Sequence, residues 1–269
     1  MTLGNDMVDI PTAYDFSGRS FLITGGGTGI GRATALLVAR QGARVTLASR
    51  KTDALESVAE EVRAIGAEAL VLTTDVLDPD AITSMIDSHV SHFGGCDVLV
   101  NNSGGSYMFP LDQWDLPNWQ RMIDLNLRAV WLASRQMAPI MIEAGGGSIV
   151  NVSSGAAVGV LPEVAPYAVA KLGVEHMTRL FAAAWGKDGI RVNCVRVGAV
   201  KSEGYLRSMS RSGRDPDEAG GRNAVGRAGW PIEVAHGIAY LSGYGSGFTT
   251  GVVLPIDGGP MTVLDERPE

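Results

Sequence analysis

The sequence has few cysteines and no long uninterrupted apolar run. Only Cys96 and Cys194 occur in 269 residues, which excludes a disulfide-rich secreted scaffold. Both lie among apolar residues, so we expect two buried free thiols, the alternative being one disulfide. No stretch approaches the ~18 apolar residues of a membrane helix. We therefore expect a soluble, cytoplasmic protein with no membrane partner, in which residues 1–16 form an N-terminal arm outside the fold.

Positive charge and histidine are also scarce. The net charge of -7 argues against nucleic acid as a partner, because such proteins are normally basic. Two of the four histidines, His89 and His92, are three residues apart in a predicted helix. They could form half of a metal site, but no third ligand accompanies them. A solvated helix face is the favoured interpretation, and no metal is expected.

Short β-branched runs alternate with helical patterns along the whole chain. The runs are apolar throughout, which is typical of parallel strands buried on both faces. We predict a single doubly wound Rossmann-type α/β domain over residues 17–269, with helices on both faces. A polar segment at 198–229 is hard to assign and is interpreted as a substrate lid. The seven expected strands are Ser20–Thr24, Arg44–Ser49, Ala69–Thr74, Asp97–Asn101, Ser148–Ser153, Ile190–Val197 and Val252–Ile256.

A glycine-rich turn follows the first predicted strand and opens the first predicted helix. Glycines in such a turn let the backbone approach a pyrophosphate, and the helix N-terminus supplies amide donors. Gly25, Gly29 and Gly31 have the spacing T-G-x-x-x-G-x-G, which resembles the short-chain dehydrogenase/reductase family. The resemblance implies that this turn surrounds the pyrophosphate of NAD or NADP. The expected cofactor-binding residues of the turn are Gly25, Thr28, Gly29, Ile30 and Gly31.

The end of the second strand bears on which dinucleotide binds. An NAD enzyme usually has an acidic residue there, which accepts hydrogen bonds from the ribose 2′-hydroxyl. This chain has Ser49 followed by Arg50 and Lys51. The two cations would attract a 2′-phosphate, although they could also simply solvate the start of a helix. The cofactor is therefore predicted to be NADP, with NAD less favoured.

Three further segments are assigned to the cofactor by the same resemblance. Asp75 and Val76 match the positions that contact adenine, the alternative for Asp75 being a helix cap. Asn102, Ser103 and Gly104 match the family's Asn-Ala-Gly, with Ser103 in place of alanine, and are expected beside the adenosine ribose. Beyond the sixth strand, the implied contacts to the nicotinamide half are Gly198, Val200 and Ser202.

Tyr167 and Lys171 are four residues apart in a predicted helix and so share one face. Free tyrosine has a pKa of ~10, and lowering it to ~7 requires about 4 kcal/mol. A lysine cation at ~4 Å in a shielded site can supply that much. By the family resemblance Tyr167 is the general acid/base, and Lys171 lowers its pKa and holds the nicotinamide ribose.

Two other residues complete the expected catalytic set. Ser154 lies thirteen positions before Tyr167, the family's spacing for the serine that orients the substrate oxygen, and Ser153 is the rival. Asn126 interrupts an apolar stripe on a long predicted helix. It is either a structural amide bonded to the backbone or, by the resemblance, a helix-kinking residue that holds a water linked to the lysine.

The resemblance covers about residues 17–260 and includes Asn193 and the Asp257-Gly-Gly segment. It departs from the family at Val197, where proline is usual, and at Ser202, where threonine is usual. The implied activity is hydride transfer between NADP(H) and a carbonyl/alcohol substrate, in a homotetramer. The alternatives are an enoyl- or dienoyl-thioester reductase and a non-catalytic dinucleotide-binding module. An apolar substrate is expected from the side chains assigned to its pocket, which are Met108, Phe109, Trp114 and Tyr205.

Overall fold

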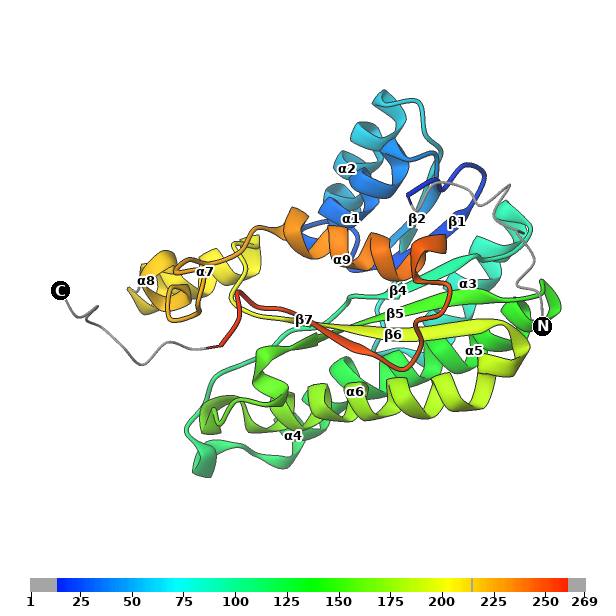
Figure 1. The fold of residues 1–269 in the computed structure, drawn as a ribbon. Coiled ribbons are helices and arrows are strands. Elements are labelled where there is room, and N and C mark those ends of the chain that lie inside the picture. Colours follow the sequence, from blue (N-terminus) through cyan, green and yellow to red (C-terminus); the bar gives the residue numbers. More distant parts are fainter. Residues whose placement is uncertain (1–13, 214, 261–269) are drawn as a thin grey trace, which may run out of the picture.

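The computed structural model describes residues 14–213 and 215–260, and within them seven strands form one parallel sheet. The strand order is β3-β2-β1-β4-β5-β6-β7 (Figure 1). Each predicted strand is present to within one residue at either end, which confirms the doubly wound α/β fold. The bounds are β1 Ser20–Thr24, β2 Arg44–Ser49, β3 Ala69–Thr73, β4 Val98–Asn101, β5 Gly147–Ser154, β6 Ile190–Val197 and β7 Val253–Ile256.

Helices cover both faces of the sheet, because each strand alternates apolar side chains toward both sides. In Figure 1, α1, α2 and α9 lie above the sheet, and α3, α5 and α6 lie below it. The upper layer consists of α1 Gly29–Arg40, α2 Thr52–Ala64 and α9 Pro231–Ser242. The lower layer consists of α3 Pro79–Phe93, α5 Ala129–Glu143 and α6 Ala165–Trp185. Single 3₁₀ turns occur at Leu111–Gln113, Gly155–Ala157, Pro162–Val164, Gly186–Asp188 and Tyr244–Ser246.

The long helix expected from about Asn118 is divided into three parts. It begins earlier, as α4 Leu116–Ile123, because the Asp115 carboxylate accepts a hydrogen bond from the Asn118 amide at 2.8 Å. A π turn over Asp124–Arg128 then joins α4 to α5. The wide turn changes the direction in which the following side chains point.

The segment at 198–229, which the sequence left unassigned, contains two short helices. They are α7 Glu203–Ser212 and α8 Pro216–Gly220, and they extend beyond the end of the sheet in Figure 1. Ser202 caps α7 by accepting a hydrogen bond from the Tyr205 amide at 3.2 Å. This local polar contact helps to fix the start of α7.

Two expectations about individual side chains need correction. Phe16 is fully buried against Phe21, so the boundary of the arm moves to before Phe16, and residues 1–13 lie outside the described residues. His89, expected on a solvated face, is fully buried, and its Nδ1 lies 2.7 Å from the Thr46 hydroxyl.

Both cysteines are buried and free, as predicted. Burial raises the pKa of the Cys194 thiol to about 12, and it also raises that of Cys96. No helix in the described part of the chain is both long enough and apolar enough to span a membrane.

Candidate active site

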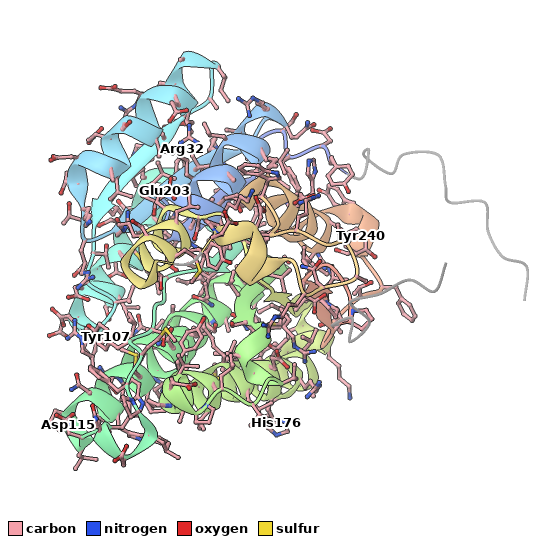
Figure 2. All side chains as sticks on the ribbon, turned by 90° about the vertical axis from the view of Figure 1, so that its left-hand side faces the viewer. Arg32, Tyr107, Asp115, His176, Glu203 and Tyr240 are labelled. Atoms are coloured by element: carbon pink, nitrogen blue, oxygen red, sulfur yellow. The ribbon has the colours of Figure 1, made fainter. Side chains whose placement is uncertain are left out.

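The expected site residues gather at the carboxyl ends of the strands, where a parallel α/β sheet normally binds its ligands. The chain crosses over between β3 and β4, so β4 pairs with β1 and leaves a crevice at the switch point. Figure 2 looks onto this end of the molecule, with α7 and α8 in front. The glycine turn after β1 and the loops after β4, β5 and β6 all open here.

The glycine turn has the shape of a cradle that side chains would fill. Gly25 and Gly29 have φ of 69° and 53°, a region that glycine adopts without strain. A Cβ on Gly31 would overlap the carbonyl oxygen of Gly25 and lie 2.8 Å from Asn102 Nδ2. The backbone is therefore bare at the N-terminus of α1, as a bound pyrophosphate requires. Beside the glycines, Thr28 is the N-cap residue of α1, and Ile30 packs on the core.

The loop after β4 is held against the glycine turn by hydrogen bonds. The Thr24 hydroxyl accepts hydrogen bonds from the Asn102 and Ser103 amides, both at 3.0 Å. The Asn102 side chain donates to the carbonyl oxygens of Thr24 at 2.9 Å and Gly25 at 3.2 Å. The Asn102 side chain thus holds the glycine turn in place. Ser103 takes part through its backbone amide, so serine in place of alanine disturbs none of these hydrogen bonds.

The segment 198–229 begins directly beside the same turn. A Cβ on Gly29 would lie 3.0 Å from the Ser202 Cβ and 3.4 Å from a carboxylate oxygen of Glu203. Figure 2 labels Glu203 and Arg32 at this end of the molecule. Gly198 has no space for a side chain, because its Cβ would lie 2.7 Å from the Asp257 Cα. Val200 is buried and pairs with Gly229 across the base of the segment 198–229.

The positions expected to bind the adenosine half lie at the ends of β2 and β3. Ser49 is half-buried, and Arg50 and Lys51 are exposed at the start of α2. Asp75 accepts a hydrogen bond from the Leu77 amide at 3.0 Å and forms a local turn, but the residue that caps α3 is Asp78, so the capping alternative for Asp75 is wrong. Val76 is buried below it.

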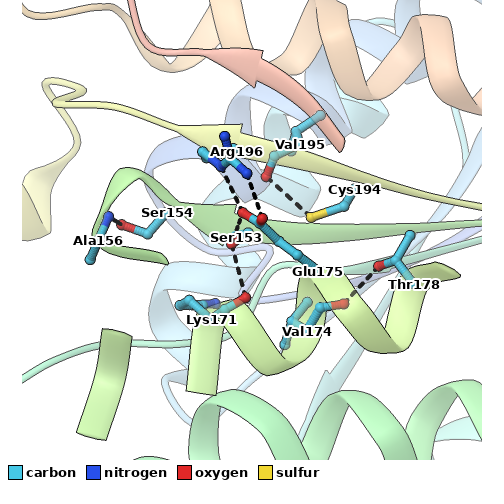
Figure 3. Close-up of polar contacts among 10 residues, drawn as sticks. All are labelled: Ser153, Ser154, Ala156, Lys171, Val174, Glu175, Thr178, Cys194, Val195 and Arg196. Atoms are coloured by element: carbon cyan, nitrogen blue, oxygen red, sulfur yellow. Dashed lines mark hydrogen bonds and ion pairs between the residues drawn. The ribbon is translucent and has the colours of Figure 1, made fainter. Parts of the chain in front are cut away.

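Ser154 and Tyr167 are in contact, and Ser154 is the serine that faces the site. Its hydroxyl accepts a hydrogen bond from the Ala156 amide at 3.2 Å and also bonds the Tyr167 side chain. The rival, Ser153, is buried and points to the other side, where its hydroxyl lies 3.2 Å from the Lys171 carbonyl oxygen. Figure 3 shows the two serines diverging from β5.

Lys171 is only 3% exposed, and its Nζ donates a hydrogen bond to the Val152 carbonyl oxygen at 2.8 Å. Nζ lies 5.7 Å from the centroid of the Tyr167 ring. Burial lowers the pKa of Lys171 to about 8, so the amine is mostly protonated at neutral pH. The residue expected to supply the positive charge is therefore next to the phenol and screened from water.

Burial also raises the pKa of Tyr167, and the hydrogen bond to Ser154 opposes that rise. The expected lowering of this pKa is therefore not a property of Tyr167 and Lys171 alone. Desolvation of the phenolate outweighs the favourable contacts, because a buried phenol loses the water that would stabilise its charge.

Asn126 is fully buried in the π turn, and its amide is bonded to the backbone, as the structural alternative predicted. Its Nδ2 donates to the carbonyl oxygens of Gly105 at 2.9 Å and Met122 at 3.0 Å. A Cβ on Gly104 would lie 2.8 Å from Asn126 Oδ1 and 3.3 Å from Lys171 Nζ. Gly104 therefore lets Asn126 and Lys171 approach the loop after β4 from two sides.

Sequence reasoning did not identify the pairing of Glu175 with Arg196 behind Lys171. The two side chains form a two-bond ion pair, with donor–acceptor distances of 2.8 Å and 2.6 Å. The signal was Arg196 within the strand Ile190–Val197, which also contains Arg191 and Asn193 among its apolar residues. A cation in a buried strand requires a partner, which the sequence alone does not identify.

The comparisons with known proteins agree with this geometry. A profile of the family described as Enoyl-(Acyl carrier protein) reductase matches residues 25–261. The chain is 36% identical over 248 residues to cis-4-hydroxycyclohexanecarboxylate dehydrogenase of Sinomonas cyclohexanicum, covering 91% of this chain and 97% of that protein.

Solved structures give the same result. A short-chain type dehydrogenase/reductase from Mycobacterium marinum superposes with a TM-score of 0.86 at 32% identity, covering 91% of this chain and 96% of that one. A protein from Beutenbergia cavernae, described as an NAD(P)-dependent gluconate 5-dehydrogenase with NADP at low occupancy, gives a TM-score of 0.86 at 30% identity, with coverages of 91% and 98%. With its glycine turn and its serine, tyrosine and lysine at one end of a seven-stranded parallel sheet, this chain belongs to the short-chain dehydrogenase/reductase family.

Proposed function

We propose that this protein is an NADP(H)-dependent oxidoreductase that interconverts an alcohol and a carbonyl compound. The observation that carries the proposal is the contact of Ser154 with Tyr167, and of Tyr167 with the buried Lys171, at the sheet end where the glycine turn opens. Each group has the chemistry that the reaction needs, and the relatives are dehydrogenases that act on CH–OH groups.

Tyr167, Ser154 and Lys171 would each have a separate role at the substrate oxygen. Tyr167 gives a proton to that oxygen during reduction and takes one during oxidation. Ser154 hydrogen-bonds the same oxygen and orients it toward the phenol. Lys171 supplies a fixed positive charge that favours the phenolate. NADP(H), when bound, supplies or accepts the hydride.

The residues at the glycine turn fit a dinucleotide, because the cradle at Gly31 excludes any side chain and the N-terminus of α1 is directed at it. The preference for NADP over NAD rests on Ser49, Arg50 and Lys51. Replacing both cations, in Arg50→Ser/Lys51→Ser, is expected to raise the KM for NADPH about tenfold and leave that for NADH nearly unchanged. Equal changes with the two cofactors would contradict the preference.

The positive charge of an oxidised nicotinamide would add to that of Lys171 and oppose the effect of burial on Tyr167. Loading with the oxidised cofactor should therefore make the phenol more acidic. Tyr167→Phe is expected to abolish turnover while cofactor binding persists. Near-normal turnover by this variant would contradict the role of the phenol.

The substrate is proposed to be an apolar, ring-containing alcohol or ketone. Phe109 packs edge-on against Trp114, with ring centroids 5.0 Å apart, and Tyr107 lies 6.3 Å from Phe109. These rings follow the loop after β4, next to Gly104, and one relative is named for a substituted cyclohexanol. A panel of cyclic and linear ketones, followed by NADPH absorbance and repeated with NADH, tests both substrate and cofactor.

A second candidate is the reduction of an enoyl thioester, favoured by the description of the matching family profile. Three arginines between residues 198 and 229 could bind an acyl-carrier phosphate. The structure describes Arg207 but not the side chain of Arg211, and Arg214 lies outside the described residues. An enoyl thioester and a ketone assayed side by side separate the two reactions. Oxidation of NADPH with any substrate rules out the non-catalytic alternative.

The remaining expectations stay proposals. We propose that residues 198–229 act as the substrate lid of a single catalytic domain that extends over the rest of the chain. The contact of this segment with the glycine turn, through Ser202, supports the role of a lid. A homotetramer and a cytoplasmic location rest on the sequence and the family resemblance, and sedimentation of the purified protein tests the first.

A further inference from the structure

A carboxylate is buried one helical turn beyond Lys171, on the side of α6 that faces the sheet. The Glu175 side chain is 1% exposed, and that of Arg196 is 19% exposed. Arg196 donates from Nε to Oε1 at 2.8 Å and from Nη2 to Oε2 at 2.6 Å. Burying such a pair gains little stability over an apolar pair of the same size, so its presence calls for another explanation.

The same carboxylate also contacts the strand that carries Ser154. The Ser153 hydroxyl lies 2.9 Å from Glu175 Oε1 and 3.2 Å from the Lys171 carbonyl oxygen. Figure 3 shows Glu175 between Arg196 of β6, Ser153 of β5 and the turn of α6 that begins at Lys171. One side chain therefore links the three elements whose spacing sets the distance from Ser154 to Tyr167.

The Glu175–Arg196 pair and Lys171 together carry one net positive charge. Glu175 and Arg196 cancel each other, and the hydrogen bond to Glu175 raises the pKa of Arg196. The Cys194 thiol, which interacts with both Glu175 and Lys171, has its pKa raised to about 12 by burial and is neutral. Asp257 adds a further negative charge that interacts electrostatically with Arg196. Lys171 is thus the one group in this set whose charge is directed at Tyr167.

We propose that Glu175 and Arg196 are a positioning pair, which fixes β5 and β6 against α6 and keeps the charge behind Lys171 neutral. This inference rests on the proposed function, because it assigns the pair to the acid/base chemistry of Tyr167. Neither residue touches the substrate, so both act through Ser153, Lys171 and the helix between them.

The charge argument gives two single variants with opposite effects. Glu175→Gln keeps the shape and removes the carboxylate that forms the ion pair with Arg196, and the added net positive charge favours the phenolate of Tyr167. Arg196→Met leaves the carboxylate without its cation, which disfavours the phenolate. Eight residues of helix separate Tyr167 from Glu175, about 12 Å, and partial exposure of Arg196 screens the charge. We therefore expect shifts of about half a pKa unit, down in the first variant and up in the second.

The experiment measures the acidity of Tyr167 without turnover. Tyrosinate absorbance is titrated in the presence of NADP⁺, and the same titration of a Tyr167→Phe partner is subtracted in every background. The backgrounds are the natural sequence, E175Q, R196M, the double variant and R196K. The matched control is Glu56→Gln, which makes the same charge change at the exposed Arg63–Glu56 pair on the opposite layer.

The proposal expects shifts of opposite sign in E175Q and R196M, a midpoint restored in the double variant and in R196K, and no shift in the control. The midpoint of kcat/KM against pH for alcohol oxidation should move in parallel. Midpoints that stay in place, or that move in the same direction in both single variants, overturn it. A variant that only destabilises the fold lowers the unfolding temperature without this sign pattern. Absence of turnover in the natural sequence contradicts the proposed function instead, because the titration does not depend on it.

Discussion

The buried imidazole of His89 should make the protein lose stability in mild acid. Its Nδ1 lies 2.7 Å from the Thr46 hydroxyl, and its Nε2 is buried with no hydrogen-bond partner in the described part of the chain. Burial lowers the pKa of His89 from 6.5 to about 4, and the nearby charges of Arg44 and His92 act in the same direction, with Asp97 opposing them. The folded state therefore holds the neutral ring.

The direction and size of the effect follow from proton linkage. A histidine whose pKa is lower in the folded than in the unfolded state contributes its full stability above pH 6.5 and loses it as the pH falls toward 4. About 2.5 units at 1.36 kcal/mol each give a loss of about 3 kcal/mol, of which about 2 kcal/mol is lost by pH 5. This is a large part of the usual 5–15 kcal/mol of a folded domain.

The assay is urea unfolding at several pH values between about 7.5 and 4.5, at one protein concentration. His89→Gln, which keeps a polar partner for Thr46, is expected to be less stable near pH 7 but to lose about 2 kcal/mol less than the natural protein by pH 5. His92→Gln on the same helix is the control, because His92 is half-exposed. If His89→Gln and the natural protein lose stability in parallel, the imidazole is not the acid-sensitive group.

Three further predictions concern other parts of the fold. Gly31→Ala should weaken NADPH binding at least tenfold, because the new methyl group would overlap the Gly25 carbonyl, and a fluorescence titration measures this; unchanged affinity would count against the cradle. Cys96 and Cys194 should react with a thiol reagent only after unfolding, because both are buried and their pKa values are raised; rapid labelling of native protein would contradict their burial. Asp78→Ala removes the cap of α3 and should lower the free energy of unfolding by about 1 kcal/mol, measured in urea.

The sequence predicted the parts of the site that depend on local spacing. The turn from Gly25 to Gly31 and the pair Tyr167 and Lys171 each lie within two turns of chain, so their geometry follows from the strand or helix that carries them. The strands were predicted closely for the same reason, because an apolar run bounded by turn residues determines its own ends.

Contacts between distant segments could not be predicted in this way. Ser202 meets Gly29, and Arg196 of β6 meets Glu175 of α6, only because the fold brings these segments together. The pKa of Tyr167 also depends on burial, which opposes the effect of the hydrogen bond to Ser154. The extent of this burial cannot be read from the sequence. A buried histidine looks the same in sequence as a solvated one, because its burial depends on the strand beside it.

The strand order has a consequence for how the chain reaches its native state. β1 pairs with β2 along one edge and with β4 along the other. The first edge can pair as soon as residues 44–48 are present, whereas the second remains unpaired until residues 98–101 are present. During synthesis the first three strands can assemble early, but the edge of β1 that pairs with β4 stays open until about 75 residues beyond the end of β1 have emerged. Strands that are far apart in the sequence pair slowly, and until they do, the unpaired strand edges can bind other chains. A nascent chain that stalls between β3 and β4 should therefore be the species that aggregates or recruits a chaperone.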